Sequence, residues 1–165
     1  MLHYELKTEY RGHEDDVRAI RANPEKNTEF ATVSRDKTLR IWTSADTTQC
    51  KIFTGHSSFV SCLYWAREGE IPHLKGSVLI SGSRDCRLIV WNIEEECIHY
   101  ELRGHTLDVT SICVLRNGDI ISGSQDSSIC VWRNGNLVKV LCVILPHFLL
   151  LSFEAEFFVS DTHWT

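Results

Sequence analysis

The chain has 165 residues, of which 43% are hydrophobic and 24% are charged, and its formal net charge is −5. These proportions predict one soluble globular domain. The acidic balance argues against a nucleic-acid-binding surface, which shows a basic excess. The N-terminal stretch MLHYELKTEYRGHEDD lacks the apolar core of a signal peptide. The longest apolar run, Val140 to Phe153, is broken by Pro146 and His147 and is shorter than the ~18–20 residues of a membrane span.

Seven cysteines are spread along the chain without a C-x-x-C motif, at positions 50, 62, 86, 97, 113, 130 and 142. This odd number and spacing predict neither a zinc site nor a disulfide framework. Since most of these cysteines lie in apolar runs, we expect buried, reduced thiols in a cytoplasmic and nuclear protein. We expect no metal and no cofactor.

One eleven-residue pattern occurs three times, as TVSRDKTLRIW (Thr32 to Trp42), SGSRDCRLIVW (Ser81 to Trp91) and SGSQDSSICVW (Ser122 to Trp132). Each copy has a hydroxyl residue first, Asp fifth and Trp last, and each follows a Gly-His pair. The distance from Asp to Trp is constant, whereas the distance from His to Asp varies, as it does when loops connect fixed corners. The sequence therefore contains an internal repeat.

In chain order, each repeat unit contains β-branched and aromatic runs bounded by turn residues, which predicts short strands. The expected strands are VRAIRANP, EFATVSRD, TLRIWTS and QCKIFTGH, then FVSCLYWARE, SVLISGSRD, RLIVWNI and CIHYELRGH, then VTSICVLRNGD, DIISGSQD, SICVWRNG and LVKVL. Several, such as RLIVW, are apolar on both faces, as in sheets covered on both sides. Four-stranded sheets stacked in this way, repeating every ~40–45 residues, form the blades of a β-propeller.

On these three strings, over about residues 11 to 140, the sequence resembles the WD-repeat β-propeller family. The resemblance implies an all-β fold in which a His, a hydroxyl, an Asp and a Trp of each blade form a hydrogen-bonded structural tetrad. A buried imidazole and carboxylate are costly unless they satisfy each other, and the tetrad does so. The implied tetrads are His13, Thr32, Asp36 and Trp42; His56, Ser81, Asp85 and Trp91; and His105, Ser122, Asp126 and Trp132.

The expected organisation is an incomplete propeller over 1–141, with blades at about 11–54, 55–103 and 104–141, and a non-repeat apolar and acidic tail over 142–165. Residues 3–10 stand where the family donates the outer strand of its last blade, so here they are an orphan closing strand. Because a propeller needs about four to eight blades to close, we expect an open arc from a truncated isoform or an incomplete gene model.

The family also places certain positions on a rim around the central channel. We call this set the rim, and it consists of Asp16, Arg18, Arg35, Phe59, Ser61, Arg84, Asp108, Thr110 and Gln125. The two arginines before the turn Asp and an exposed Phe59 are candidate partner-binding anchors, since Arg and aromatic residues dominate binding hot spots. The alternative is a solvated polar rim. An insert, EGEIPHLKG (Glu68 to Gly76), is expected to be a solvated loop or, less readily, a recognition element.

The strings YRGHEDDVRAI, TGHSSFVSCLYW and EIPHLKGSVLISGSRD further resemble the first blades of the phospholipase A-2-activating protein subfamily. That resemblance implies ubiquitin binding in ubiquitin-dependent protein catabolism, linked to the proteasome and to ubiquitin homeostasis. It places recruitment of the valosin-containing AAA ATPase in separate C-terminal domains, to which nothing in this sequence corresponds.

Two other functions remain open. A generic WD-repeat scaffold would bind an unrelated peptide or protein. An enzyme is disfavoured, because a catalytic triad is built once, whereas this Ser/Thr-His-Asp set is built three times beside a Trp suited to burial. Neither a phosphate-binding loop nor the lipase motif G-x-S-x-G is present.

Overall fold

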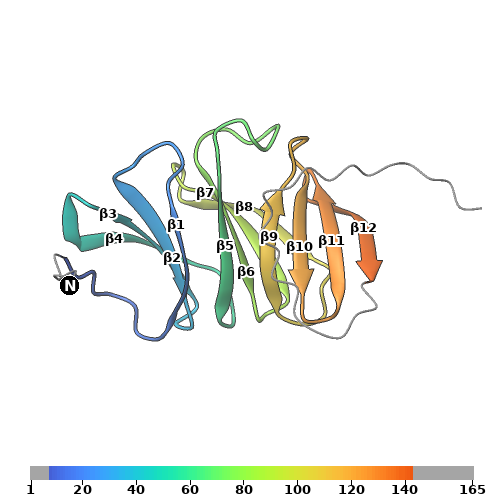
Figure 1. The fold of residues 1–165 in the computed structure, drawn as a ribbon, viewed down its shortest axis with the longest axis horizontal. Helices are drawn as coiled ribbons and strands as arrows, with labels where there is room; N and C mark the ends of the chain where they lie inside the picture. The colour runs from blue at the N-terminus through green and yellow to red at the C-terminus, as the bar shows by residue number, and fades with distance from the viewer. Residues whose placement is uncertain (1–7, 143–165) are drawn as a thin grey trace, which may run out of the picture.

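The computed structural model describes residues 8–142, which form three four-stranded antiparallel sheets arranged side by side in an open arc (Figure 1). This confirms the predicted all-β fold of partial propeller blades. We call the sheets blades 1, 2 and 3 in chain order. No helix long and apolar enough to cross a membrane occurs in this described part of the chain.

Within each blade the four strands follow one another as neighbours. Blade 1 consists of β1 (Val17–Ala22), β2 (Glu29–Ser34), β3 (Thr38–Thr43) and β4 (Asp46–Thr54). Blade 2 consists of β5 (Val60–Ala66), β6 (Val78–Ser83), β7 (Arg87–Asn92) and β8 (Cys97–Arg103). Blade 3 consists of β9 (Val109–Val114), β10 (Ile120–Ser124), β11 (Ser128–Arg133) and β12 (Asn136–Cys142). Ten of these strands fall within the predicted runs, whereas β4 begins three residues before its predicted run and β12 extends one residue beyond its run at each end.

The core lies between the blades. One apolar cluster joins blades 1 and 2 and includes Leu39, Leu79 and Trp91. A second joins blades 2 and 3 and includes Leu88 and Trp132. Because blade 2 is covered on both faces, every residue of β6 is buried, as are all residues of β7 after the first. The two-sided apolar pattern of RLIVW has this physical origin.

The outer faces of the end blades are less covered. Val17 and Ile20 on β1 are 54% and 56% exposed. On β12 every residue is exposed, including four large apolar side chains, Leu137, Val138, Val140 and Leu141. Among the described residues no further blade packs against these surfaces.

Tyr10 occupies a place that repeats in the next blade. Its ring makes edge contacts with Phe30 and Trp42, at centroid distances of 4.9 and 5.8 Å. Phe53, at the end of β4, contacts Trp91 in the same way at 5.8 Å. Tyr10 therefore lies where an outer-strand residue of a preceding blade would lie.

Of the expected closing strand, residues 3–7 fall outside the described residues and 8–10 form no strand. The expected tail falls outside them too, except for Cys142, the last residue of β12.

The insert of blade 2 is the expected solvated loop only in part, because five of its nine residues are exposed but two apolar residues are buried. Its side chains Ile71 and Leu74 are 8% and 9% exposed and belong to the cluster between blades 2 and 3. Glu70 accepts hydrogen bonds from the Tyr64 hydroxyl and the Arg67 N–H, both at 2.7 Å, and so fixes the start of the insert. Two apolar side chains of the insert therefore pack between blades 2 and 3.

The expectation of buried cysteines is correct for only two of the seven. All seven are free thiols, and Cys62 and Cys130 are buried, whereas Cys97 and Cys142 are exposed. The three others are partly exposed. Cys50 lies on the outer strand β4, Cys113 lies on β9 of the last blade, and Cys86 lies in a turn.

Candidate functional site

The structure brings together all three predicted tetrads with nearly the same geometry. In each, the His Nδ1 lies 2.7 to 3.0 Å from an Asp Oδ2. The His Nε2 lies 2.7 to 2.8 Å from the Thr or Ser hydroxyl. The same hydroxyl accepts a 2.8 Å hydrogen bond from the Trp Nε1. A carboxylate can only accept, so Nδ1 donates to it, and Nε2 of the neutral ring accepts from the hydroxyl.

Each tetrad Asp also holds two stretches of backbone in place. In blade 2, Asp85 accepts from the N–H of Arg87 at 3.1 Å and from the N–H of Ser57 at 2.9 Å. Asp36 and Asp126 make the same two kinds of bond. The Asp therefore ties the turn between the second and third strands to the loop that enters the blade, and both segments carry rim residues.

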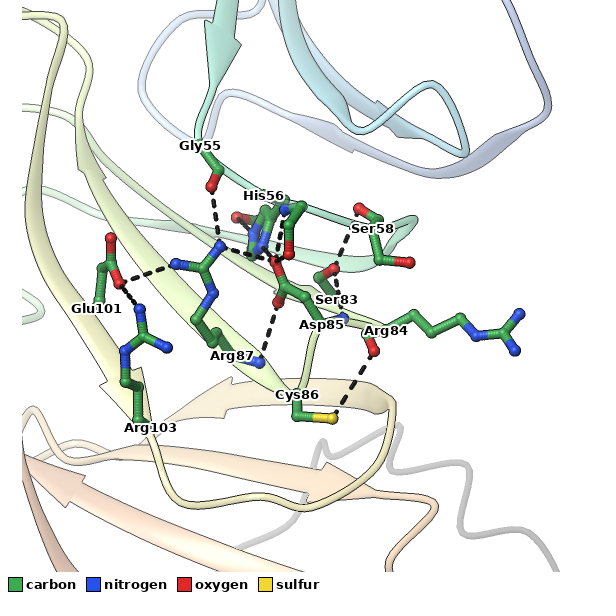
Figure 2. Close-up of polar contacts among 12 residues, drawn as sticks. Gly55, His56, Ser58, Ser83, Arg84, Asp85, Cys86, Arg87, Glu101 and Arg103 are labelled. Carbon is green, nitrogen blue, oxygen red and sulfur yellow. Dashed lines mark hydrogen bonds and ion pairs between the residues drawn. The ribbon is translucent and has the colours of Figure 1, made fainter.

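Blade 2 differs from its neighbours in one partner of the Asp. In blades 1 and 3 the hydroxyls of Thr38 and Ser128 donate to the Asp. In blade 2 the residue at this place is Arg87, whose Nη2 donates to Asp85 and to the Gly55 carbonyl, each at 2.9 Å, while Nη1 donates to Glu101 (Figure 2). Arg87 thus supplies charge where the other blades supply a hydroxyl.

These contacts keep the three carboxylates ionised. Burial acts to raise the pKa of Asp126, but hydrogen bonds from Ser128, the Thr106 N–H and His105 outweigh it and lower the pKa to about 2. Burial likewise opposes ionisation of Asp36 and Asp85, and their hydrogen bonds hold both pKa values well below the usual range. The ionised form is therefore the one that the fold stabilises.

A fifth residue completes each network, and the sequence prediction missed it. Ser34, Ser83 and Ser124 stand two residues before the tetrad Asp and accept its N–H at 3.0 to 3.1 Å. Each hydroxyl also donates to a carbonyl of the entering loop, at 3.0 to 3.3 Å. The signal was present, because S-R-D, S-R-D and S-Q-D all place Ser at the same distance from Asp.

The Gly of each Gly-His pair is explained by the tetrad Trp. A Cβ on Gly12, Gly55 or Gly104 would lie 2.8 to 2.9 Å from Cη2 of the Trp in the same blade. Real Cβ atoms do not approach so closely, so the indole ring fits only against a residue without a side chain.

The geometry does not suit the tetrad hydroxyls for nucleophilic catalysis. Ser81 and Ser122 are 0% exposed and Thr32 is 6% exposed, and each is already bonded to both His and Trp. A nucleophile must reach a substrate carbonyl, and these oxygens have no open side. Within residues 8–142, no group of His, Cys, Asp or Glu side chains is arranged to hold a metal ion.

At the rim, two arginines lie over one aromatic ring. The guanidinium carbons of Arg35 and Arg84 are 5.5 and 5.6 Å from the centroid of the Phe59 ring. Phe59 was expected to be exposed but is partly buried, and two guanidinium groups lie over its ring. The Arg84 N–H donates to the Phe59 carbonyl at 2.9 Å, which fixes the loop against the turn. In Figure 2, the Arg84 side chain extends away from the buried network around Asp85.

Carboxylates flank this stack on both sides. Asp16 Oδ2 lies 3.2 Å from Nη1 of Arg35, and Asp108 Oδ1 lies 3.9 Å from Nε of Arg84. A chain of contacts therefore runs from Asp16 through the stack to Asp108 and crosses all three blades. Of the other four predicted rim residues, Gln125 joins this chain of contacts, because its N–H donates to the Asp108 carbonyl at 2.9 Å. Arg18, Ser61 and Thr110 lie on the first strands of the blades, β1, β5 and β9.

Comparison with known proteins finds several relatives of similar sequence. The chain is 32% identical over 130 residues to phospholipase A-2-activating protein of Xenopus laevis, which covers 76% of this chain and 16% of that protein. It is 30% identical over 129 residues to ubiquitin homeostasis protein lub1 of Schizosaccharomyces pombe, covering 78% and 17%. It is 29% identical over 104 residues to coatomer subunit beta'-2 of Arabidopsis thaliana, covering 63% and 11%. The chain thus spans less than a fifth of the length of these relatives.

The model of the family described as "WD domain, G-beta repeat" matches residues 4–43, 47–92 and 95–133. Each match ends with the third strand of a blade, β3, β7 or β11, and the second and third matches begin at or near the outer strand of the blade before. The first match likewise begins ahead of Tyr10, which lies at an outer-strand position. Because the three matches cover more than half of its length and each contains a complete tetrad, the chain belongs to the WD-repeat family.

Proposed function

We propose that this chain is a non-enzymatic interaction module that binds ubiquitin through its rim, in ubiquitin-dependent protein catabolism and ubiquitin homeostasis. Two of its relatives support this proposal, one named for ubiquitin homeostasis and one named phospholipase A-2-activating protein. The observation that carries it is the stack of Arg35, Phe59 and Arg84. The cytoplasm and nucleus are the compartments in which such a module would work.

The stack has the chemistry of a small binding centre. An aromatic ring offers apolar area, and arginines offer donors on weakly hydrated planar groups, so both residue types are enriched in hot spots. Ubiquitin recognition uses a small apolar patch ringed by basic residues, so Phe59 would contact the patch. Asp16 and Asp108 would face the basic residues around that patch of ubiquitin. Such a small transient interface binds weakly, with a Kd on the order of micromolar or above.

The test is a titration of isotope-labelled ubiquitin with the 165-residue chain, read by chemical-shift changes. Saturable shifts are expected, and the double variant Phe59→Ala/Arg84→Ala should weaken binding at least about tenfold. A matched control is Arg103→Ala, an exposed arginine on β8 that pairs with Glu101 and lies on the other side of the Asp85 network from Arg84 (Figure 2). Absence of shifts with the unmodified chain would reject ubiquitin as the partner. A double variant that binds as tightly as the unmodified chain would reject the rim as the site.

A generic scaffold is the second candidate, and the similarity to a coatomer subunit favours it. It shares the rim as the binding surface but predicts another protein or peptide as partner. In the same titration, a scaffold of this kind would leave the ubiquitin spectrum unchanged.

A further inference from the structure

Two of the three rim arginines lie beside a carboxylate that offsets their charge. Arg35 and Arg84 both lie over Phe59, and each has a carboxylate of its own, Asp16 at 3.2 Å and Asp108 at 3.9 Å. The two carboxylates come from the loops entering blades 1 and 3, whereas the arginines come from turns in blades 1 and 2. The pairing of Arg84 with Asp108 therefore depends on how the blades pack and not on one local turn.

We propose that Asp16 and Asp108 determine the specificity of the rim. By cancelling the charge of the two stacked arginines, they make the rim accept a protein surface with an apolar centre and no acidic excess, and reject acidic peptides. This inference rests on the proposed function, which identifies ubiquitin as the partner.

The physical argument compares an acidic and an apolar partner. A carboxylate that approaches Arg35 or Arg84 meets a guanidinium already paired with an Asp, and it is repelled by that Asp at nearly the same distance. At distances well beyond the separation of the two charges, each pair acts as neutral because its opposite charges cancel. Salt screens the remaining field over a Debye length of about 8 Å at physiological ionic strength. Electrostatic steering of an acidic ligand is therefore small.

For an apolar partner the same arrangement is favourable. The arginines lie over Phe59 with a carboxylate beside each, so their planar faces and the exposed part of the ring form one surface. Fewer side-chain motions then remain to be frozen on binding than for unpaired arginines. The remaining rim arginine, Arg18, follows the acidic loop residues Glu14 and Asp15, so it adds no basic excess to this part of the chain.

The test removes the carboxylates without changing shape. The double variant Asp16→Asn/Asp108→Asn is compared with the unmodified chain and with Glu94→Gln/Glu95→Gln, which changes the net charge equally in an exposed turn between β7 and β8. Two probes are used, a fluorescein-labelled octa-glutamate peptide followed by anisotropy, and labelled ubiquitin followed by chemical shift. Both are titrated at 25 and 150 mM NaCl.

We expect the rim variant to bind octa-glutamate at least about tenfold more tightly than the unmodified chain at low salt, and to lose most of this gain at high salt. We expect the control to match the unmodified chain. The proposal is overturned if the unmodified chain already binds the peptide as tightly as the rim variant, or if the control gains as much. The peptide comparison holds whether or not ubiquitin binds, so an absence of ubiquitin shifts would reject the proposed function and leave the specificity inference to be decided by the peptide.

Discussion

Pro72, in the insert of blade 2, packs against Gly118, in the first turn of blade 3, so closely that a Cβ on Gly118 would overlap with Cδ of the proline ring. Both the insert and the turn between β9 and β10 lie along the upper edge of Figure 1, at the end of the blades opposite the turn between β10 and β11. The same insert contributes Ile71 and Leu74 to the apolar cluster between blades 2 and 3. The proline ring therefore gives the insert a direct contact with the backbone of the neighbouring blade.

Replacement of Gly118 by Ala should therefore destabilise the chain more than replacement of Gly69 by Ala. Both glycines have positive φ, +84° and +76°, so both variants carry a conformational cost of about 1–2 kcal/mol. At Gly69 a Cβ would meet nothing within 4 Å, whereas at Gly118 it adds an overlap that costs a further ~1–3 kcal/mol. Urea unfolding of the two variants measures the difference. Equal costs would mean that the insert is free to move away.

Loss of a tetrad carboxylate should be costly. Asp85→Ala removes the acceptor of His56, of two backbone N–H groups and of Arg87, and we expect it to lower the free energy of unfolding by about 1–3 kcal/mol. Glu94→Ala, at an exposed position of the same blade, should stay within about 0.5 kcal/mol. Chemical denaturation of both variants compares them, and similar values for the two would show that Asp85 has no structural role.

The depressed pKa values predict a specific acid dependence. An Asp whose folded pKa lies below its unfolded value contributes stability that is complete above the unfolded pKa of about 3.9. That contribution is lost as the pH falls through the folded pKa, which for Asp126 is about 2. We expect the free energy of unfolding to decline from about pH 4 downward and the decline to be shallower in Asp126→Asn. Denaturation curves between pH 2 and 7 provide the measurement, and parallel profiles for the two proteins would contradict it.

The buried serine of blade 2 offers a fourth prediction. Ser83→Ala leaves the Asp85 N–H without its acceptor and the Ser58 carbonyl without its donor, so it should cost about 1–2 kcal/mol. Ser44→Ala, at an exposed position after β3, is the matched change and should be nearly neutral. Thermal unfolding of the pair decides the question, and a neutral Ser83→Ala would remove the serine from the network.

The repeated pattern predicted what is decided within one blade. Strands, turns and tetrads depend on residues at fixed spacing, so His56, Asp85 and Trp91 could be identified together. Contacts between blades could not be predicted from this spacing. The stacking of Arg35 from blade 1 over Phe59 depends on how two sheets pack, and so does the reduced exposure of Phe59. The insert is an intermediate case, because Ile71 and Leu74 are apolar residues in a loop that was otherwise expected to be polar.

The network beneath the rim also affects how a mutational scan of this surface would have to be interpreted. Ser83 is 0% exposed and cannot touch a partner, yet its hydroxyl donates to the Ser58 carbonyl, one residue before Phe59. Its alanine variant would shift the loop that carries Phe59 and would lower affinity as if a contact had been lost. A footprint drawn from affinities alone would include this buried residue. Measuring the stability of each variant beside its affinity would separate true contacts from supports.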